Sequence, residues 1–115
     1  MEEECIFCKI IAGEIPADIV LENRDVVVFR DLTPQAPVHL LAIPRKHIPT
    51  INDLQTTDAQ QLGHLFLAAK EAAAQEGVAE DGYRTVMNCG AGAGQSVFHI
   101  HLHILGGRPL SWPPG

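Results

Sequence analysis

Helical spacing of apolar residues marks two segments of the chain. Apolar side chains recur three or four positions apart within residues 4–12, and Gly13 follows, which predicts a short helix. A longer pattern of the same kind fills residues 57–77, where Thr57 and Gln60 fit a capping box and Gly77 can end the helix. The positions expected on the buried face of the long helix are Leu62, Leu65, Phe66, Ala69 and Ala73.

Strand signals lie on both sides of the long helix. Residues 18–22 and 26–31 are β-rich runs separated by a short turn, which indicates a hairpin, and residues 38–44, 83–88 and 97–105 are the other expected strands. Strands and helices do not alternate regularly. We therefore expect an α+β fold with an antiparallel sheet of about five strands and the long helix covering one face. The length of 115 residues favours a single domain spanning the chain.

The stretch HIHLHIL, residues 99–105, alternates histidines with large apolar residues. In a strand, side chains two positions apart point to the same face. We therefore expect one face to carry the imidazoles and the opposite face to belong to the core. The imidazole face carries His99, His101 and His103, and the core face carries Phe98, Ile100, Leu102 and Ile104.

Three interpretations of the histidine face follow from the residues alone. A solvated face is one, although such faces usually carry Thr, Lys, Glu or Arg. A metal site is the second, but His99 and His103 start roughly 13–14 Å apart, so one ion shared by all three is difficult. Phosphate chemistry is the third, because an imidazole can attack phosphorus or carry a proton near neutral pH. The glycine-rich segment 90–96 just before the histidines favours this third interpretation, because glycines let backbone N–H groups face an anion and Ser96 adds a hydroxyl.

Charge and composition exclude several classes of protein. The net charge is −6 and the eight basic residues are scattered, so we expect no nucleic-acid face. No apolar run approaches the roughly 20 residues of a membrane span, and the acidic start MEEE is unlike a signal peptide. The odd count of three cysteines argues against a disulfide framework. We therefore expect a soluble cytoplasmic protein without a membrane partner.

Cys5 and Cys8 form a C-x-x-C pair with three possible meanings. A redox pair would require a preceding strand that the sequence does not predict. Two ordinary buried thiols are the second meaning. Zinc is the third, although two thiolates supply only half of a tetrahedral site.

The HIHLHIL stretch resembles the signature of the histidine triad (HIT) family. The resemblance extends to IFCKIIAGEIPADIV, FRDLTPQAPVHLLAIPRKHI, GYRTVMNCGAGAGQSVFHIHLHILGGR and WPPG, which are similar to the branch of histidine triad nucleotide-binding proteins. It covers essentially the whole chain. It implies a HIT-like fold, a homodimer, and hydrolysis of purine nucleoside 5′-phosphoramidates. Hydrolysis of dinucleoside polyphosphates, or a nucleotide-binding scaffold with residual catalysis, are the alternative activities.

The resemblance also implies a role for each catalytic residue. His101 would attack the α-phosphorus to form a nucleotidyl-histidine, with its other ring nitrogen donating to a backbone carbonyl. His103 would contact the phosphate oxygens and assist the leaving group or the incoming water. Ser96 and the backbone after Gly94 would stabilise the developing charge. His39 would support the triad from a neighbouring strand, although by itself it fits a satisfied core histidine.

The nucleotide pocket implied by the resemblance combines apolar and polar positions. Asp31 would bind the ribose hydroxyls, and Trp112 would reach the active site of a partner subunit. The purine slot would consist of Phe7, Ile10, Phe29, Leu32 and Leu41, of which Phe7, Ile10 and Leu41 fit a plain core equally well. The residues around the phosphate would be Asn88, Gly94, Gln95, Ser96, Val97, His101 and His103.

For the cysteine pair, the resemblance favours zinc. In related proteins with a matching pair, two histidines complete the site, here His47 and His99. Four protein ligands would make this zinc structural. His99 would then serve the metal, while His101 and His103 serve the phosphate.

Overall fold

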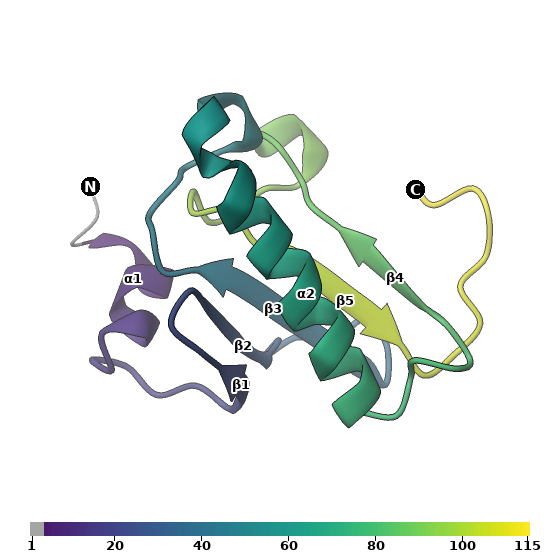
Figure 1. The fold of residues 1–115 in the computed structure, drawn as a ribbon. Helices are drawn as coiled ribbons and strands as arrows, with labels where there is room; N and C mark the ends of the chain where they lie inside the picture. Colours follow the sequence, from purple (N-terminus) through teal and green to yellow (C-terminus); the bar gives the residue numbers. More distant parts are fainter. Residues whose placement is uncertain (1–3) are drawn as a thin grey trace.

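The computed structural model describes residues 4–115, so the first three residues of the acidic start lie outside the described part of the chain. Figure 1 shows the path of the chain, and its elements are α1 (Ile6–Ile11), β1 (Ile19–Glu22), β2 (Val26–Arg30), β3 (Val38–Pro44), α2 (Ala59–Gln75), β4 (Tyr83–Val86) and β5 (Leu102–Gly106). Single 3₁₀ turns lie at Ile51–Asp53, Thr56–Asp58 and Ala91–Ala93.

The strands form one sheet in the order β1-β2-β3-β5-β4, and every neighbouring pair is antiparallel. The α+β fold expected from the sequence is therefore confirmed. β3 and β5 are neighbours near the middle of the sheet, with Leu41 opposite His103. This pairing brings the strand that carries His39 beside the strand that carries His103.

The two faces of the sheet are covered by different helices. One set of side chains from β2, β3 and β5 packs under α2, and it comprises Val26, Val28, Leu40, Ala42, Leu102 and Ile104. The alternate set packs with α1, and it comprises Val27, Phe29, Leu41 and Ile43. β2 and β3 are thus buried on both faces, which explains why their sequences are almost continuously apolar.

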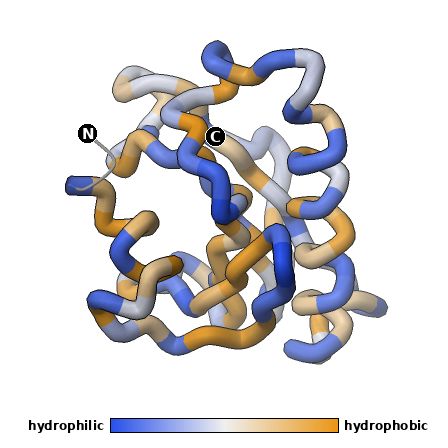
Figure 2. Tube along the Cα trace, turned by 60° about the vertical axis from the view of Figure 1, so that its left-hand side comes forward, coloured by the Kyte–Doolittle hydropathy of each residue, from blue (hydrophilic) through white to orange (hydrophobic). Residues whose placement is uncertain are grey.

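Helix α2 contacts the sheet through small residues, and polar and apolar residues alternate along it (Figure 2). Its buried residues are Leu65, Ala68, Ala69, Ala72 and Ala73. Phe66, expected on this face, is 50% exposed, so that assignment was wrong. The prediction of a capping box at Thr57 and Gln60 is also wrong. A 3₁₀ turn precedes the helix, and the Asp58 carboxylate in this turn accepts from the backbone N–H of Gln55. Gly77 ends the helix as expected, with φ at +79°.

The last strand is shorter than its sequence suggests. β5 begins at Leu102, and the preceding residues leave the ladder with β3. The register that pairs Ala42 with Leu102 would place Pro44 opposite Ile100, and Pro44 has no N–H to donate. The N–H of Ile100 bonds to the carbonyl of Ile48 instead, at 2.8 Å.

The expected core face survives this break with one exception. Ile100, Leu102 and Ile104 all lie in the core under α2, at 2% exposure or less. Phe98, expected beside them, is 47% exposed. The exception follows from the break, because side-chain alternation is enforced only where the chain stays extended and paired.

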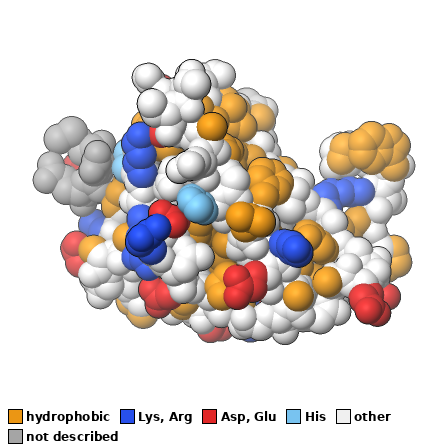
Figure 3. All heavy atoms as spheres, viewed as in Figure 1, with side chains coloured by type: hydrophobic (Ala, Val, Ile, Leu, Met, Phe, Trp, Pro, Cys, Tyr) orange, Lys and Arg blue, Asp and Glu red, His pale blue; other side chains and the backbone are white. Residues whose placement is uncertain are grey.

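Beyond β5 the chain continues as a tail that Arg84 anchors. Nη2 of Arg84 donates to the carbonyls of Leu110 and Ser111, at 3.2 and 2.9 Å. Trp112 near the end of the tail is 81% exposed, and the tail projects from the body at the right of Figure 3. Across residues 4–115, no helix has the length and apolar character to cross a membrane.

Candidate active site and metal cluster

His101 has one ring nitrogen fixed and the other available. Its Nδ1 lies 2.9 Å from the backbone carbonyl oxygen of His99. A carbonyl can only accept, so in the neutral ring Nδ1 carries the proton and Nε2 keeps a lone pair. The ring is 6% exposed and packs edge-on against Phe7, with the ring centroids 5.1 Å apart. A neutral His101 can therefore act as a nucleophile through Nε2.

His103 is held in the opposite tautomer by a chain of hydrogen bonds, here called the relay. The backbone N–H of Gln35 donates to Nδ1 of His39 across 3.0 Å, which leaves the proton of a neutral His39 on Nε2. His39 Nε2 in turn lies 2.9 Å from His103 Nδ1 and donates to it. The proton of His103 must then sit on its own Nε2. The site thus pairs a ring that accepts with a ring that donates.

Both rings of the relay are neutral near pH 7. Burial lowers the pKa of His39, and the charge of Asp31 opposes that shift. Burial also lowers the pKa of His103, to about 4, and the neighbouring rings of His101 and His39 add to the effect. Neutral rings are the condition for the tautomers assigned above.

Asp31 lies at the edge of the relay. One carboxylate oxygen accepts from the N–H of Thr33 at 2.8 Å, and the other lies 3.4 Å from Nε2 of His39. The Asp31 side chain is 19% exposed. A carboxylate in this position is reachable from solvent while it interacts with the relay.

The apolar residues expected in the purine slot lie together, with one exception. Phe7 and Phe29 meet edge to face with centroids 5.6 Å apart, and Leu41 belongs to the same cluster. Ile10 and Val97 pack against it. Leu32 is 96% exposed and lies outside this cluster.

The glycine-rich segment is a tight turn braced from within. Gly90 and Gly94 have φ of +88° and +96°, which explains the choice of glycine at these positions. The buried Gln95 accepts from the N–H of Gly90 at 2.8 Å and donates to the carbonyls of Pro49 and Val97. Its side chain therefore holds the loop, and its backbone N–H closes the same turn by donating to the carbonyl of Gly90 at 3.0 Å.

The polar groups next to this turn face outward. Ser96, at the end of the turn, is exposed. The amide nitrogen of Asn88 lies beside Gly94, 3.8 Å from the position that a Cβ would occupy there. The hydroxyl of Ser96 and the amide of Asn88 thus offer hydrogen-bond donors beside the turn, while the N–H groups of Ala93, Gly94 and Gln95 are used within it.

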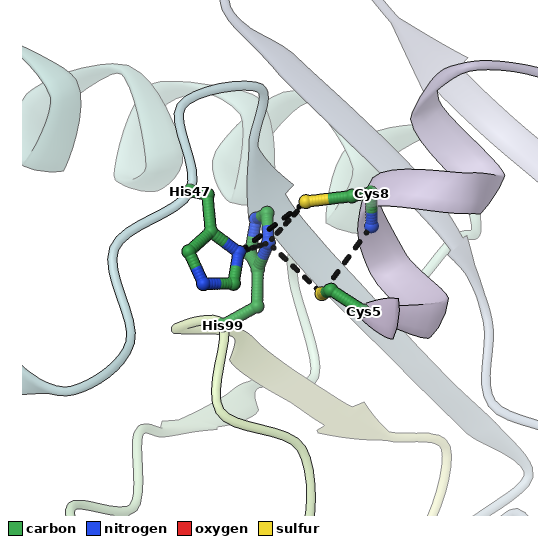
Figure 4. A group of neighbouring side chains, drawn as sticks. All are labelled: Cys5, Cys8, His47 and His99. Atoms are coloured by element: carbon green, nitrogen blue, oxygen red, sulfur yellow. Dashed lines mark hydrogen bonds between the residues drawn. The ribbon is translucent and has the colours of Figure 1, made fainter. Parts of the chain in front are cut away.

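The four residues suggested for zinc point toward one another (Figure 4). Nδ1 of His99 lies 3.5 Å from the sulfur of Cys5 and 3.5 Å from that of Cys8. Nδ1 of His47 lies 3.3 Å from the sulfur of Cys8 and 3.1 Å from Nδ1 of His99. A tetrahedral zinc site with two sulfur and two nitrogen ligands has edges of about 3.3–3.8 Å, so these spacings suit such an ion.

The hydrogen bonds around His99 also suit a metal. Its Nε2 donates to the carbonyl of Pro44 at 2.8 Å, so the lone pair of Nδ1 faces the cysteines. The ring is fully buried, which rules out a solvated polar face at this position. The sulfur of Cys5 also accepts from the N–H of Cys8 at 3.4 Å.

A second cluster, Asp31, His39 and His103, has its potential ligand atoms equally close together. There the hydrogen bonds oppose a metal. The N–H of Gln35 occupies Nδ1 of His39, so Nε2, the nitrogen that faces the cluster, carries a proton. The two clusters therefore differ in tautomer: one presents a lone pair and the other presents an N–H.

Comparison with known proteins identifies the family. The model of the family described as "Scavenger mRNA decapping enzyme C-term binding" matches residues 4–109. The purine nucleoside phosphoramidase of Escherichia coli K12 is 54% identical over 110 residues, which cover 96% of this chain and 92% of that protein. A HIT family hydrolase from Legionella pneumophila superimposes with a TM-score of 0.95, at 54% identity, over 97% of this chain and 100% of that one. This chain belongs to the histidine triad family.

A histidine triad protein from Clostridium difficile superimposes with a TM-score of 0.91, at 40% identity, over 94% of each chain.

Several backbone groups that shape this histidine triad site could not be identified from the sequence. The Gln35 N–H, the Pro44 carbonyl and the His99 carbonyl are all backbone groups, and every residue type carries such groups. No side-chain pattern signals them. The proline at position 44 is a partial exception, because it marks a place where a ladder must stop.

The low pKa of His103 predicts how stability depends on pH. The folded protein holds this pKa at about 4, below the value of 6.5 expected when the chain is unfolded. Between these values the unfolded chain binds more protons, so the contribution of neutral His103 is complete above about pH 6.5 and is lost as the pH falls towards 4.

Urea unfolding of the protein and of a His103→Gln variant, between about pH 7.5 and 4.5, measures this contribution. The free energy of unfolding of the variant should fall less steeply with decreasing pH. The proposed metal ligands are the same in both proteins, so their protonation cancels in the comparison. Equal slopes would contradict the burial of a neutral His103.

Proposed function

We propose that this protein is a purine nucleoside phosphoramidase, which hydrolyses nucleoside 5′-phosphoramidates to an amine and a nucleoside monophosphate. The observation that carries the proposal is the pair of opposite tautomers: His101 presents a lone pair at Nε2 and His103 presents an N–H. The E. coli relative at 54% identity, which bears this enzymatic name, supports the same activity.

In the first step, Nε2 of His101 attacks the α-phosphorus and the P–N bond breaks. The negative charge of the bound phosphate favours uptake of a second proton from solvent by His103, and the ring then gives its Nε2 proton to the departing amine and is left neutral. The Nδ1–H of His101 remains bonded to the His99 carbonyl, which stabilises the positive ring of the nucleotidyl-histidine.

In the second step, water attacks the same phosphorus and displaces His101. The water gives one proton back to Nε2 of His103. The ring loses its second proton to solvent when the product leaves, so both histidines return to their starting states. Ser96 and the backbone N–H groups after Gly94 stabilise the charge on the phosphoryl oxygens in both steps. His39 holds His103 in place through the relay.

The nucleoside occupies the surface beside the triad. Phe7, Phe29 and Leu41 form the apolar wall for the purine, with Ile10 at its edge and Leu32 available from the following loop. Asp31 accepts from the ribose hydroxyls, because one of its oxygens is only weakly engaged by His39. Asn88, Gln95 and Val97 contribute around the phosphate.

Substitution of the nucleophile tests this function. His101→Ala should lose at least about a thousandfold in kcat on an adenosine phosphoramidate, while the affinity for AMP stays within a few-fold. His64→Ala, an exposed histidine of α2, is the matched control and should keep wild-type turnover. Turnover close to wild type in His101→Ala would remove His101 from the nucleophile role. Faster cleavage of a diadenosine polyphosphate by the wild type, or binding without turnover, would point to the alternative activities.

We further propose that Cys5, Cys8, His47 and His99 bind one zinc ion. The support is the set of tetrahedral spacings and the lone pair of His99 that faces the thiols. A zinc with four protein ligands supplies structural stability. It would fasten α1 to the segment that leads into β5, next to the nucleophile.

Metal analysis and melting test the zinc site. Protein purified without chelator should contain about one zinc per chain. The double variant Cys5→Ser/Cys8→Ser should lose the zinc and melt at least about 5 °C lower, because metal binding is linked to folding. Cys89→Ser, a change at the remaining cysteine, should keep both the zinc and the melting temperature. A wild-type protein that contains no zinc and gains no stability on adding it would reject the site.

We also propose that the chain is a single-domain cytoplasmic protein that forms a homodimer. Among residues 4–115, no strand pairs with the outer edge of β4, and the exposed Trp112 on the projecting tail suits a site in a partner subunit. The three cysteines form no disulfide, which agrees with a reducing compartment.

Light scattering at micromolar concentration tests the dimer. It should give a mass about twice the 12.5 kDa of one chain. The mass of a monomer would contradict the dimer and would leave Trp112 without its proposed site.

A further inference from the structure

Gln35, which donates to His39 at the start of the relay, is itself bonded to a residue 73 positions later in the sequence. Gln35 donates its N–H to Nδ1 of His39, and its carbonyl accepts from Nη2 of Arg108 at 3.0 Å. Arg108 lies two residues beyond β5, the strand that carries His103. The guanidinium and the last ring of the relay thus belong to one short stretch of chain.

The backbone beside Arg108 packs directly on the same loop. Gly107 has φ of +91°, and a Cβ built there would lie 2.9 Å from Cβ of Pro37, closer than real contacts allow. Any other residue at 107 would push this segment off the loop. Gly106 pairs with Val38 at the start of β3, so the close approach continues the ladder between β3 and β5.

Other hydrogen bonds of the loop leave the Gln35 carbonyl to Arg108. This carbonyl and the Gln35 N–H belong to successive peptide units that meet at the Cα of Gln35. Thr33 N–H bonds to the carboxylate of Asp31, and the Gln35 side chain donates to the carbonyl of Thr33 at 3.0 Å. These bonds shape the first half of the loop. The carbonyl of Gln35 lies beyond them, where the bond from Arg108 restrains it.

We propose that Arg108 is a positioning residue for catalysis, which by holding the Gln35 carbonyl keeps the Gln35 N–H on Nδ1 of His39. This inference rests on the proposed phosphoramidase function. With that N–H in place, the proton of His39 stays on Nε2 and the proton of His103 stays on the nitrogen that faces the substrate.

Loss of the restraint allows the other arrangement of the same two protons. If release of its carbonyl lets the backbone of Gln35 shift and its N–H leave Nδ1, His39 can carry its proton on Nδ1 and accept at Nε2 from Nδ1 of His103. His103 would then present a lone pair to the substrate instead of an N–H. No bond to carbon or phosphorus changes, and the fold keeps its core, because the side chain of Arg108 is exposed.

The test compares Arg108→Met, which keeps an unbranched side chain of about the length of the arginine stem and removes the donors, with Arg84→Met. Arg84 also anchors the tail, through the carbonyls of Leu110 and Ser111, but none of its hydrogen bonds reaches the loop of Gln35. Nitrogen-15 NMR of the imidazoles near pH 7.5 distinguishes the two tautomers of each histidine. His39 and His103 should both carry the proton on Nε2 in the wild type and in Arg84→Met, and should shift measurably towards Nδ1 in Arg108→Met.

Kinetics supply the second measurement. In Arg108→Met, kcat should fall about tenfold with KM within about twofold, because the fault lies in proton delivery rather than in binding. Arg108→Lys should recover part of kcat and of the Nε2 tautomer, since a lysine can restore one donor to the Gln35 carbonyl. Arg108→Ala replaces Arg108→Met if the latter fails to fold.

Wild-type tautomers in the variant at position 108 would overturn the proposal, whatever the activity. The same tautomer shift in Arg84→Met would also overturn it, since anchoring of the tail would then explain the effect. If the wild type hydrolyses no phosphoramidate, the proposed function fails while the NMR comparison still decides whether Arg108 positions the relay.

Discussion

The hydrogen bond from His99 Nε2 to the Pro44 carbonyl orients His99, the residue that links the possible metal cluster to His101. It turns Nδ1 of His99 toward Cys5 and Cys8, and it fixes the residue whose own carbonyl receives the Nδ1–H of His101. The bond exists because the ladder between β3 and β5 stops at a residue without an N–H. A local failure of strand pairing thus supplies the backbone acceptors that orient two of the three histidines.

The sequence predicted the architecture because the architecture depends on apolar spacing. The runs that became β2 and β3, and the long helical pattern of α2, are dictated by burial, and burial leaves a periodic trace in the sequence. The strand expected over residues 97–105 begins only at Leu102, because strand pairing leaves no such trace in the sequence. Alternation of His and apolar residues continues through Phe98 and His99, but regular pairing with β3 does not. Periodicity reports which face a side chain prefers, and it does not report whether a partner strand is present.

The sequence predicted which residues make up the candidate site, but for most of the histidines it did not predict which ring nitrogen carries the proton. The resemblance to the histidine triad family suggested roles for His101, His103, His39 and the four possible zinc ligands, and the structure brings the residues of each group together. For His101, the resemblance also implied a ring nitrogen that donates to a backbone carbonyl. The sequence could not provide the tautomers of His39, His99 and His103, because these are set by the Gln35 N–H and the Pro44 carbonyl. Identical imidazoles two or four residues apart therefore suit the different roles that we propose for them: a ligand, a nucleophile and a proton donor.

The two ends of the chain converge on this short histidine segment from opposite sides. The N-terminal cysteines approach His99, while Arg108, just past the last strand, reaches the loop behind His39 and His103. Neither contact belongs to the core under α2, where the fully buried Leu65 and Ala72 pack on the sheet. The free energy that holds the sheet and the contacts that set the protons of the triad thus come from different parts of the molecule. Because independent contacts contribute separately, changes at the ends can alter proton placement while the sheet remains folded.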